Sequence, residues 1–506
     1  MSPWRHGFRL PTIYAMVVVG SATVVLAGFL RESVIARTFG TSAAADGVVL
    51  SIALPQFLQT LLIGPIINGS GVRRLAQAGD RHHTVQVGFA LMLGGLATTL
   101  PVLLVALLAP ALLVHVLAPS AGGRVLATAG SLMPWVAGSS IALYSAAVLT
   151  ALLNIRGHAR FTTFAQALPA LAIVASLLAL HGLGTAAYGI GALAGAAILL
   201  LVSGQRLLAG VRDPVGLLEL PDAGLIREEL KRLVVPSAAL MGAAALGQVL
   251  AVVERSVALG AQTGTLAAIS YALRITSVPV VLSTGMLSSI IFVRLARASE
   301  ADFGPYLMRV VGVLSLGITF VAALLFVNAN LVVDVFLRRG AFDAHSAAST
   351  VLFLRLYCFA VPLQLLAPLL GYALYARGRA TAVAAISAVT IVVNAVILIG
   401  LSPWLGPRAI PLAFLVVSVL SVLFQALALR HELGHASHKL RRMAAPALYV
   451  AVCAAACAVM VGPLGGVFAR GLLGAVTSTL VLGGLGAPAL LAAAPQRLAS
   501  PADADA

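Results

Sequence analysis

The sequence predicts an all-α polytopic membrane protein: about fourteen transmembrane helices, in two six-helix lobes related by a parallel repeat, plus two C-terminal helices. Three observations carry this prediction. Of the 506 residues, 60% are hydrophobic and only 9% are charged, whereas ordinary soluble domains are about a quarter charged. Apolar runs of about 20 residues recur along the whole chain. Part of the first half also recurs, in weakened form, in the second half.

The apolar runs are long enough to cross a membrane as helices. A helix rises about 1.5 Å per residue, so about 20 residues span a hydrocarbon core of roughly 30 Å. The first run lacks a small-residue cleavage site and is followed at once by others, so we expect a span and not a signal peptide. The runs are approximately 13–30, 48–67, 85–107, 125–153, 163–180, 187–209, 233–258, 267–292, 306–327, 352–374, 380–399, 410–429, 444–461 and 472–493.

The repeat relates the segment from Arg31 to Arg73 to a segment 224 positions later, without a gap. Each copy starts at the end of one span and runs through the next. Because six spans separate the copies, both halves enter the membrane from the same side. Repeats of this kind build a substrate site between two halves that rock against each other. Matched pairs include Arg31 with Arg255, Gly40 with Gly264, Thr41 with Thr265, Pro55 with Pro279, and Arg73 with Arg297.

The polar segment 211–232 separates the two halves and contains five of the sixteen acidic residues. We therefore expect an N-terminal six-helix lobe at 1–210, a cytoplasmic linker at 211–232 and a C-terminal six-helix lobe at 233–430. Two extra transmembrane helices at 431–494 lie outside the repeat. The small and polar tail at 495–506 is expected to be disordered.

The formal charge of +16 is explained by topology and does not indicate a nucleic-acid partner. When connecting segments are assigned alternately with the N-terminus inside, the inner ones hold 22 Lys and Arg residues and the outer ones hold 7. Such a bias predicts cytoplasmic N- and C-termini and an even number of spans.

Six charged residues lie in spans or at their ends, where charge is costly and marks a cavity or a substrate route. Four arginines against two acids favour an anionic substrate, since guanidinium groups suit phosphate. The competing interpretation, a long arginine that snorkels to the interface, fits Arg355 better than Arg274, which is about seven residues into its span. The six are Arg31, Glu32, Glu254, Arg255, Arg274 and Arg355.

Two of these arginines have an acidic neighbour in the sequence. Adjacent residues do not share a helical face, so we expect neither Arg31 and Glu32 nor Glu254 and Arg255 to form an ion pair. The repeat gives Arg31 and Arg255 equivalent positions in the two halves, which predicts a shared role.

The motif H-E-x-x-H at 431–435 is typical of zinc metalloproteases. Here it lies in a basic linker outside the spans, and the acids that follow it are Asp503 and Asp505 in the tail. His438 is a further possible ligand, but a histidine-bearing loop explains it as well. We expect no metal site, no cofactor and no enzymatic activity. The sequence has no G-x-x-x-x-G-K-[ST], so energy would come from the membrane potential, an ion gradient or consumption of substrate on the far side.

Several stretches resemble the MviN/MurJ lipid II flippase family. The stretch from Gly28 to Gly40, GFLRESVIARTFG, resembles the opening of these proteins, as do 45–47 and 54–55. Residues 271–275 with Pro279 are similar to the family's eighth span, and 339–342 and 371–377 to its later loops. The resemblance implies the multidrug/oligosaccharidyl-lipid/polysaccharide exporter fold, with two six-helix lobes in a V and two extra helices that form a lipid-facing groove.

The resemblance also implies site residues. Arg31, Glu32 (aspartate in the family) and Arg274 match family cavity positions needed for transport. At three other positions the chain departs from the family: an arginine is replaced by Gln59, an acid by Gly64, and an arginine of late span 1 by Val25. The candidate substrate-binding residues are Arg31, Glu32, Arg274, Arg255 and Gln59.

We therefore expect a flippase for a polyprenyl-pyrophosphate-linked sugar in the bacterial cytoplasmic (inner) membrane. Lipid II is the substrate that we favour. The partners of this flippase would be the lipid-linked oligosaccharide, membrane lipids and a coupling ion, and not nucleic acid. Three alternatives stay open: a flippase for another lipid-linked glycan of exopolysaccharide or O-antigen type, a cation-coupled drug antiporter of the same fold, and a membrane scaffold that transports nothing.

Overall fold

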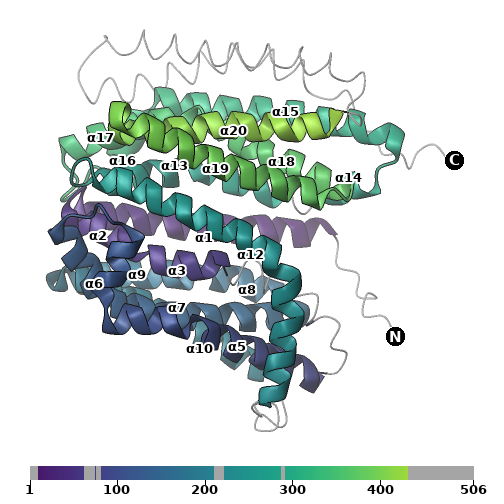
Figure 1. The fold of residues 1–506 in the computed structure, drawn as a ribbon, viewed down its shortest axis with the longest axis horizontal. Coiled ribbons are helices and arrows are strands. Elements are labelled where there is room, and N and C mark those ends of the chain that lie inside the picture. Colours follow the sequence, from purple (N-terminus) through teal and green to yellow (C-terminus); the bar gives the residue numbers. More distant parts are fainter. Residues whose placement is uncertain (1–9, 62–74, 76–80, 210–221, 287–290, 431–506) are drawn as a thin grey trace. The chain divides into compact units, whose positions relative to one another are not determined.

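The computed structural model describes residues 10–61, 75, 81–209, 222–286 and 291–430, and every regular element in these ranges is a helix (Figure 1). The all-α class is therefore confirmed. The α-helices are α1 (Leu10–Phe39), α2 (Ala43–Ser51), α3 (Ala53–Leu58), α5 (Arg81–Leu108), α6 (Pro110–Leu117), α7 (Gly123–Ile155), α8 (Ala159–Ala165), α9 (Leu168–Ala179), α10 (Thr185–Leu208), α12 (Ala223–Leu259), α13 (Thr265–Met286), α14 (Phe292–Arg297), α15 (Glu300–Val327), α16 (Ala329–Phe336), α17 (Ala344–Cys358), α18 (Val361–Ala376), α19 (Ala380–Leu405) and α20 (Ala409–Ala428), with short 3-10 helices η3 (His181–Leu183) and η5 (Gly406–Arg408).

Ten helical stretches in the described ranges are long and apolar enough to cross a membrane, and the bent pair α17 and α18 raises this number to eleven. One of the ten, Ala380–Ala428, covers both expected spans 380–399 and 410–429. The expected spans 444–461 and 472–493 lie outside the described residues. The multi-pass membrane class is confirmed, while the count of fourteen and the division into two lobes stay predictions.

One compact unit, called unit 1 below, comprises Met1–Ile275, Phe336–Thr350 and Ser387–Ala413. Within it α7 packs against α2, α3, α5, α6 and α10, while α1 packs against α8 and α9. Glycines bring α10 close to α9: a methyl group on Gly191 would lie 2.8 Å from Ile173 Cα, and one on Gly195 would lie 2.7 Å from Pro169 Cα. Small residues at helix contacts are typical of membrane bundles, where close backbone approach replaces a hydrophobic driving force.

The second unit comprises Thr276–Val335, Val351–Ile386 and Phe414–Ala506. In its described part α15 packs against α18, and α14 contacts both. Its core includes Phe303, Leu307 and Leu369, which are fully buried.

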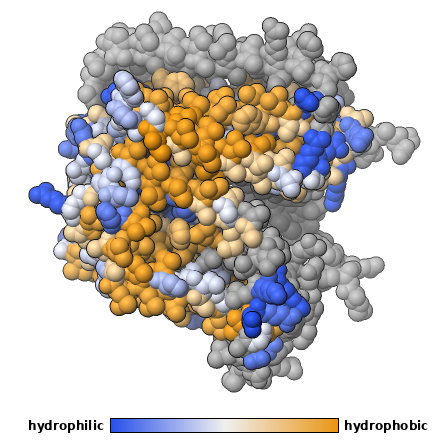
Figure 2. Space-filling view, viewed as in Figure 1, coloured by the Kyte–Doolittle hydropathy of each residue, from blue (hydrophilic) through white to orange (hydrophobic). Residues whose placement is uncertain are grey.

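Figure 2 shows hydrophobic residues over most of the visible face, with hydrophilic ones gathered near helix ends. Such a distribution suits helices that face lipid along their length and water at their ends.

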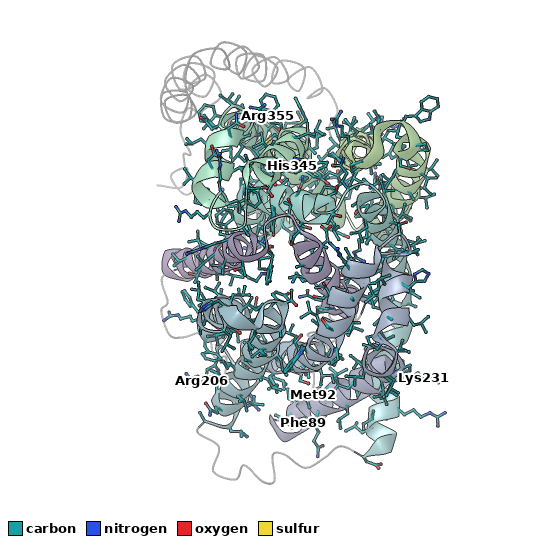
Figure 3. All side chains as sticks on the ribbon, turned by 90° about the vertical axis from the view of Figure 1, so that its left-hand side faces the viewer. Phe89, Met92, Arg206, Lys231, His345 and Arg355 are labelled. Carbon is teal, nitrogen blue, oxygen red and sulfur yellow. The ribbon has the colours of Figure 1, made fainter. Side chains whose placement is uncertain are left out.

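Helix α12 begins at Ala223, inside the segment 211–232 that we expected to be a linker. Glutamates one turn before Arg232 support the helix here: Arg232 Nη2 lies 2.5 Å from Glu228 Oε1, and Nη1 lies 3.5 Å from Glu229 Oε1. Pairs at this spacing stabilise a helix. Figure 3 labels Arg206, which lies near the end of α10, and Lys231, which lies in α12. Residues 210–221, between these helices in the sequence, are outside the described residues.

Candidate functional site

A cavity of about 490 Å³ lies within unit 1 among α1, α3, α7, α9, α10 and α13. Pockets for small ligands are typically about 300–1,000 Å³. Apolar side chains form much of the lining, and guanidinium, amide and hydroxyl groups interrupt it. The polar lining residues are Arg31, Gln59, Ser140, Tyr144, Thr150, Asn154, Gln166 and Arg274.

Helix α1 contributes Val24, Gly28 and Arg31 to the cavity wall. These residues are four and three positions apart, so they lie above one another on one helical face. The helical period therefore places the Arg31 guanidinium one turn beyond Gly28 on the cavity side of α1.

Arg31 and Glu32 form an ion pair, so our prediction that they would not was wrong. Arg31 Nη2 lies 2.5 Å from Glu32 Oε1, and the two side chains are 20% and 10% exposed. The Cβ atoms of adjacent residues point about 100° apart around a helix, which led us to expect no pair. A long arginine side chain can swing around that angle, and an unpaired carboxylate in an apolar site would be costly. The buried Nε of Arg31 makes no hydrogen bond.

Arg274 reaches the same cavity from α13. Its guanidinium lies against α1 at Gly28, one turn before Arg31, and it lines the same cavity as Arg31. The structure thus brings together three of the predicted residues, the adjacent Arg31 and Glu32 and, more than 240 positions later, Arg274. Two guanidinium groups beside one carboxylate leave a net positive site, which suits an anion with several oxygen atoms.

Gln59 also lines this cavity and is exposed within it, where it follows the last residue of α3. An amide both donates and accepts hydrogen bonds, whereas an arginine at this position would only donate. Val25 is not part of the cavity lining, and Gly64 lies outside the described residues.

Arg255 does not line this cavity, although the repeat relates it to Arg31. It lies near the end of α12, half-buried, and its buried Nη1 makes no hydrogen bond. Arg355 lies in α17, in the second unit, with its guanidinium carbon 5.8 Å from the centre of the Phe326 ring. A guanidinium over an aromatic face is a packing contact that needs no ligand.

The H-E-x-x-H motif at 431–435, with His438, lies outside the described residues. Among the residues that the structure does describe, no group of three His, Cys, Asp or Glu side chains could hold a metal ion.

Asp46 is a polar residue of unit 1 that our sequence reasoning did not select. Its carboxylate, fully buried in α2, accepts a hydrogen bond of 2.6 Å from Gly264 N–H and one of 2.9 Å from Ala267 N–H. It therefore caps the first turn of α13, where unpaired N–H groups carry partial positive charge. A sequence signal was present, since Asp46 is a rare acid next to an apolar run.

The Tyr271 hydroxyl of α13 donates a hydrogen bond of 3.0 Å to the carbonyl oxygen of Gly40, in the turn before α2. We call these bonds of Asp46 and Tyr271 the brace. Gly40 and Gly264 both have positive φ, 60° and 88°, which a residue with a side chain adopts only with strain. The brace thus joins two turns that the repeat relates.

A third segment supports the same turn. The N–H of Ala341 donates a bond of 2.9 Å to Arg37 O, and the hydroxyls of Thr41 and Ser346 lie 2.6 Å apart. Asp343 Oδ1 accepts from Ser346 N–H at 2.8 Å, and this bond lowers the pKa of the exposed Asp343 carboxyl.

The solved structures that this chain resembles include a flippase and multidrug transporters. The chain matches a structure described as lipid II flippase MurJ in an inward closed conformation, with a TM-score of 0.78 at 14% identity, over 95% of this chain and 100% of that one. It also matches inward- and outward-facing multidrug resistance MATE family transporters of the MOP superfamily. Their TM-scores are 0.57 and 0.55 at 14% and 15% identity, over 85% and 83% of this chain and 97% and 95% of theirs. At such identities these matches establish the fold alone.

Comparison of the sequence with curated proteins found no match. The sequence profile of one family, described as lipid II flippase MurJ, matches residues 35–481, which is most of the chain and includes the cavity residues from Gln59 to Arg274. The chain belongs to the lipid II flippase MurJ family.

Proposed function

We propose that this protein is a flippase that moves a polyprenyl-diphosphate-linked sugar, with lipid II as its first substrate, across the bacterial cytoplasmic membrane by alternating access. One observation supports this most: Arg31 and Arg274, from distant parts of the sequence, share one cavity of unit 1. Family membership supports the substrate, and the apolar helices support a site within the bilayer.

The charge of the cavity suits a diphosphate. Glu32 neutralises part of the Arg31 charge, so the two guanidinium groups and one carboxylate carry a net charge near +1. Like charges close together in an apolar site repel each other strongly. A bound diphosphate would relieve this repulsion and accept from donors such as the free Nε of Arg31.

The rest of the cavity suits a glycan. Gln59, Asn154 and Gln166 bring amides to the lining and Thr150 brings a hydroxyl group, whereas the Tyr144 hydroxyl donates to the carbonyl oxygen of Leu91 in α5. Sugar hydroxyls and N-acetyl groups need both donors and acceptors, and amides supply both. We therefore assign the diphosphate to the arginines and the sugar to this amide-bearing wall.

Alternating access requires a contact that closes one side and can open. The brace is the proposed contact, because it joins α2 and the turn before it to the first turns of α13 through hydrogen bonds that can break and re-form. The two copies of the repeat would separate here when the site faces the other side. Arg255 would act outside the cavity described, in a second conformation.

A second candidate is a flippase for another polyprenyl-diphosphate-linked glycan. Gln59 favours it, since an amide at this position of the cavity replaces a positive charge with a group that binds neutral sugar. Both candidates share the diphosphate and differ in the glycan.

The test is flipping by the purified full-length chain in proteoliposomes, with lipid II and with a lipid diphosphate that carries a different glycan. We expect transport of lipid II above protein-free vesicles, and its loss in Arg31→Ala/Arg274→Ala. Transport of only the other glycan would select the second candidate. Transport of neither would overturn the proposal.

A further inference from the structure

Helix α1 carries a glycine where the Arg274 guanidinium rests. An ideal Cβ built on Gly28 would overlap Arg274 Nη2 and would lie 3.2 Å from its Cζ and 3.6 Å from its Nε. Gly28 is buried in the middle of a helix of 30 residues, where glycine is less favourable than alanine by about 1 kcal/mol. The helix therefore does not need glycine here, and the space it leaves is occupied by Arg274.

This placement matters because Gly28 lies one turn before Arg31 on the same face of α1. With Nη2 against the backbone of α1, the planar Arg274 guanidinium is held beside Arg31, and both border one cavity. A methyl group at position 28 would push the Arg274 guanidinium off the helix and separate it from Arg31.

We infer that Gly28 is a positioning residue: it sets the Arg274 guanidinium beside Arg31 so that the two groups bind one diphosphate together. The inference rests on the proposed function, since it explains how the cavity achieves diphosphate geometry. Bidentate recognition depends on the plane and spacing of the guanidinium nitrogens, so a small displacement weakens binding although both charges remain.

Other glycines of the chain have different roles, which provides matched controls. A Cβ on Gly20, also in α1, would meet the side chain of Thr163 in α8, so that glycine serves helix packing. Gly130, within α7, is not part of the cavity lining, and a Cβ built on it would have no heavy atom within 4 Å. Gly130→Ala therefore tests the change in helix propensity alone.

Gly28→Ala should fold, because the atom in its way is the end of a flexible side chain and not backbone. The experiment is a double-mutant cycle: Gly28→Ala is made with Arg274 present and in Arg274→Lys, whose narrower ammonium has no Nη2 to displace. The first measurement is the affinity of the detergent-solubilised full chain for inorganic pyrophosphate, and the second is the rate of lipid II flipping in proteoliposomes.

With Arg274 present, Gly28→Ala should weaken pyrophosphate binding by roughly 10- to 100-fold. This is the change in affinity expected when one charge-assisted hydrogen bond is lost. In the Arg274→Lys protein the same change should alter affinity by about twofold or less. Flipping should follow the same pattern, with normal membrane levels and with Gly130→Ala unchanged.

Equal losses in both backgrounds, or no loss in either, would overturn the positioning role while leaving the flippase function intact. If the parent chain fails to flip lipid II but positions 28 and 274 still couple in pyrophosphate binding, the positioning role holds and the substrate assignment falls. A parent chain that neither binds pyrophosphate nor flips lipid II would overturn both.

Discussion

The Asp46 carboxylate accepts a 2.6 Å hydrogen bond from the backbone N–H of Gly264, 218 residues away in the sequence. Its other oxygen accepts from Ala267 N–H. A side chain of α2 thus performs for α13 the capping that usually comes from a residue just before a helix. Because this cap is supplied from a distant helix, it also fixes where α13 begins relative to the turn at Gly40.

Asp46→Ala should destabilise the protein more than loss of an ordinary cap. The change leaves two buried N–H groups without acceptors, each worth about 1–3 kcal/mol. The matched control is Ser42→Ala, which removes the local cap of α2, a bond of 3.3 Å to Ala45 N–H, and should cost about 1 kcal/mol. Thermal melting in detergent compares them, with Asp46→Asn expected between the two. If Asp46→Ala melted as late as Ser42→Ala, the brace would add no stability.

Glu32→Gln should lower stability and tighten pyrophosphate binding, because it frees the Arg31 guanidinium from its neighbour. Breaking a fully buried pair costs about 3–5 kcal/mol, and an exposed pair contributes at most about 1 kcal/mol. The 20% and 10% exposure of this pair places it between these limits. Glu228→Gln is the control, since its pair with Arg232 has the same 2.5 Å distance but half-exposed side chains. Equal melting shifts for the two variants would contradict a structural role for the Arg31 pair.

The sequence predicts the helices well because long apolar runs have one stable form in a bilayer, where every backbone group must be bonded within its own segment. It also predicts the relation of Gly40 to Gly264, which the structure shows as two turns with positive φ. Spacing survives in a repeat when both copies need the same backbone shape, and glycine is the residue that allows this shape.

The sequence does not predict contacts that depend on how helices pack. The pairing of Arg31 with Glu32 depends on the reach of one side chain in an apolar site, which helical periodicity does not describe. The role of Asp46 depends on a helix start more than 200 residues away. The contact of Arg274 with Gly28 likewise depends on where the long Arg274 side chain reaches α1, and no local pattern describes it.

Reporter fusions test the proposed topology. Given 22 inner against 7 outer basic residues, fusions at Arg81, Asp222 and Ala506 should report cytoplasm, and one at Gly340 should report the opposite side. A periplasmic signal at Asp222 would rule out six spans before the linker and with them the parallel repeat.

Gln59→Arg should leave lipid II flipping unchanged or raise it, since it adds a third guanidinium to the cavity. Gln56→Arg adds the same charge to α3 outside the cavity lining and should give no gain. Flipping of lipid II and of a second lipid-linked glycan is measured for both variants. If Gln59→Arg abolished lipid II flipping, the Gln59 amide would be required for binding the glycan, and an added guanidinium could not replace it.

Substitution of Arg274 distinguishes two roles for this residue: binding the diphosphate, or only extending its charge toward the membrane surface. Arg274→Lys should retain part of the flipping rate, because the charge survives while the planar fork is lost. Arg274→Ala should abolish flipping at normal membrane levels. Arg355→Ala is the control: it removes a contact with Phe326 worth about 0.5–1 kcal/mol and should leave the flipping rate unchanged.

The double variant Arg31→Ala/Arg274→Ala is the decisive case for the cavity. It removes both guanidinium groups and leaves Glu32 unpaired, so the site changes from net positive to net negative and should repel a diphosphate. Pyrophosphate binding should be lost together with flipping. Since the loss of both arginines also unpairs Glu32, adding Glu32→Gln should recover stability without recovering flipping. Full flipping by the double variant would show that transport does not need these two arginines and would exclude this cavity as the diphosphate site.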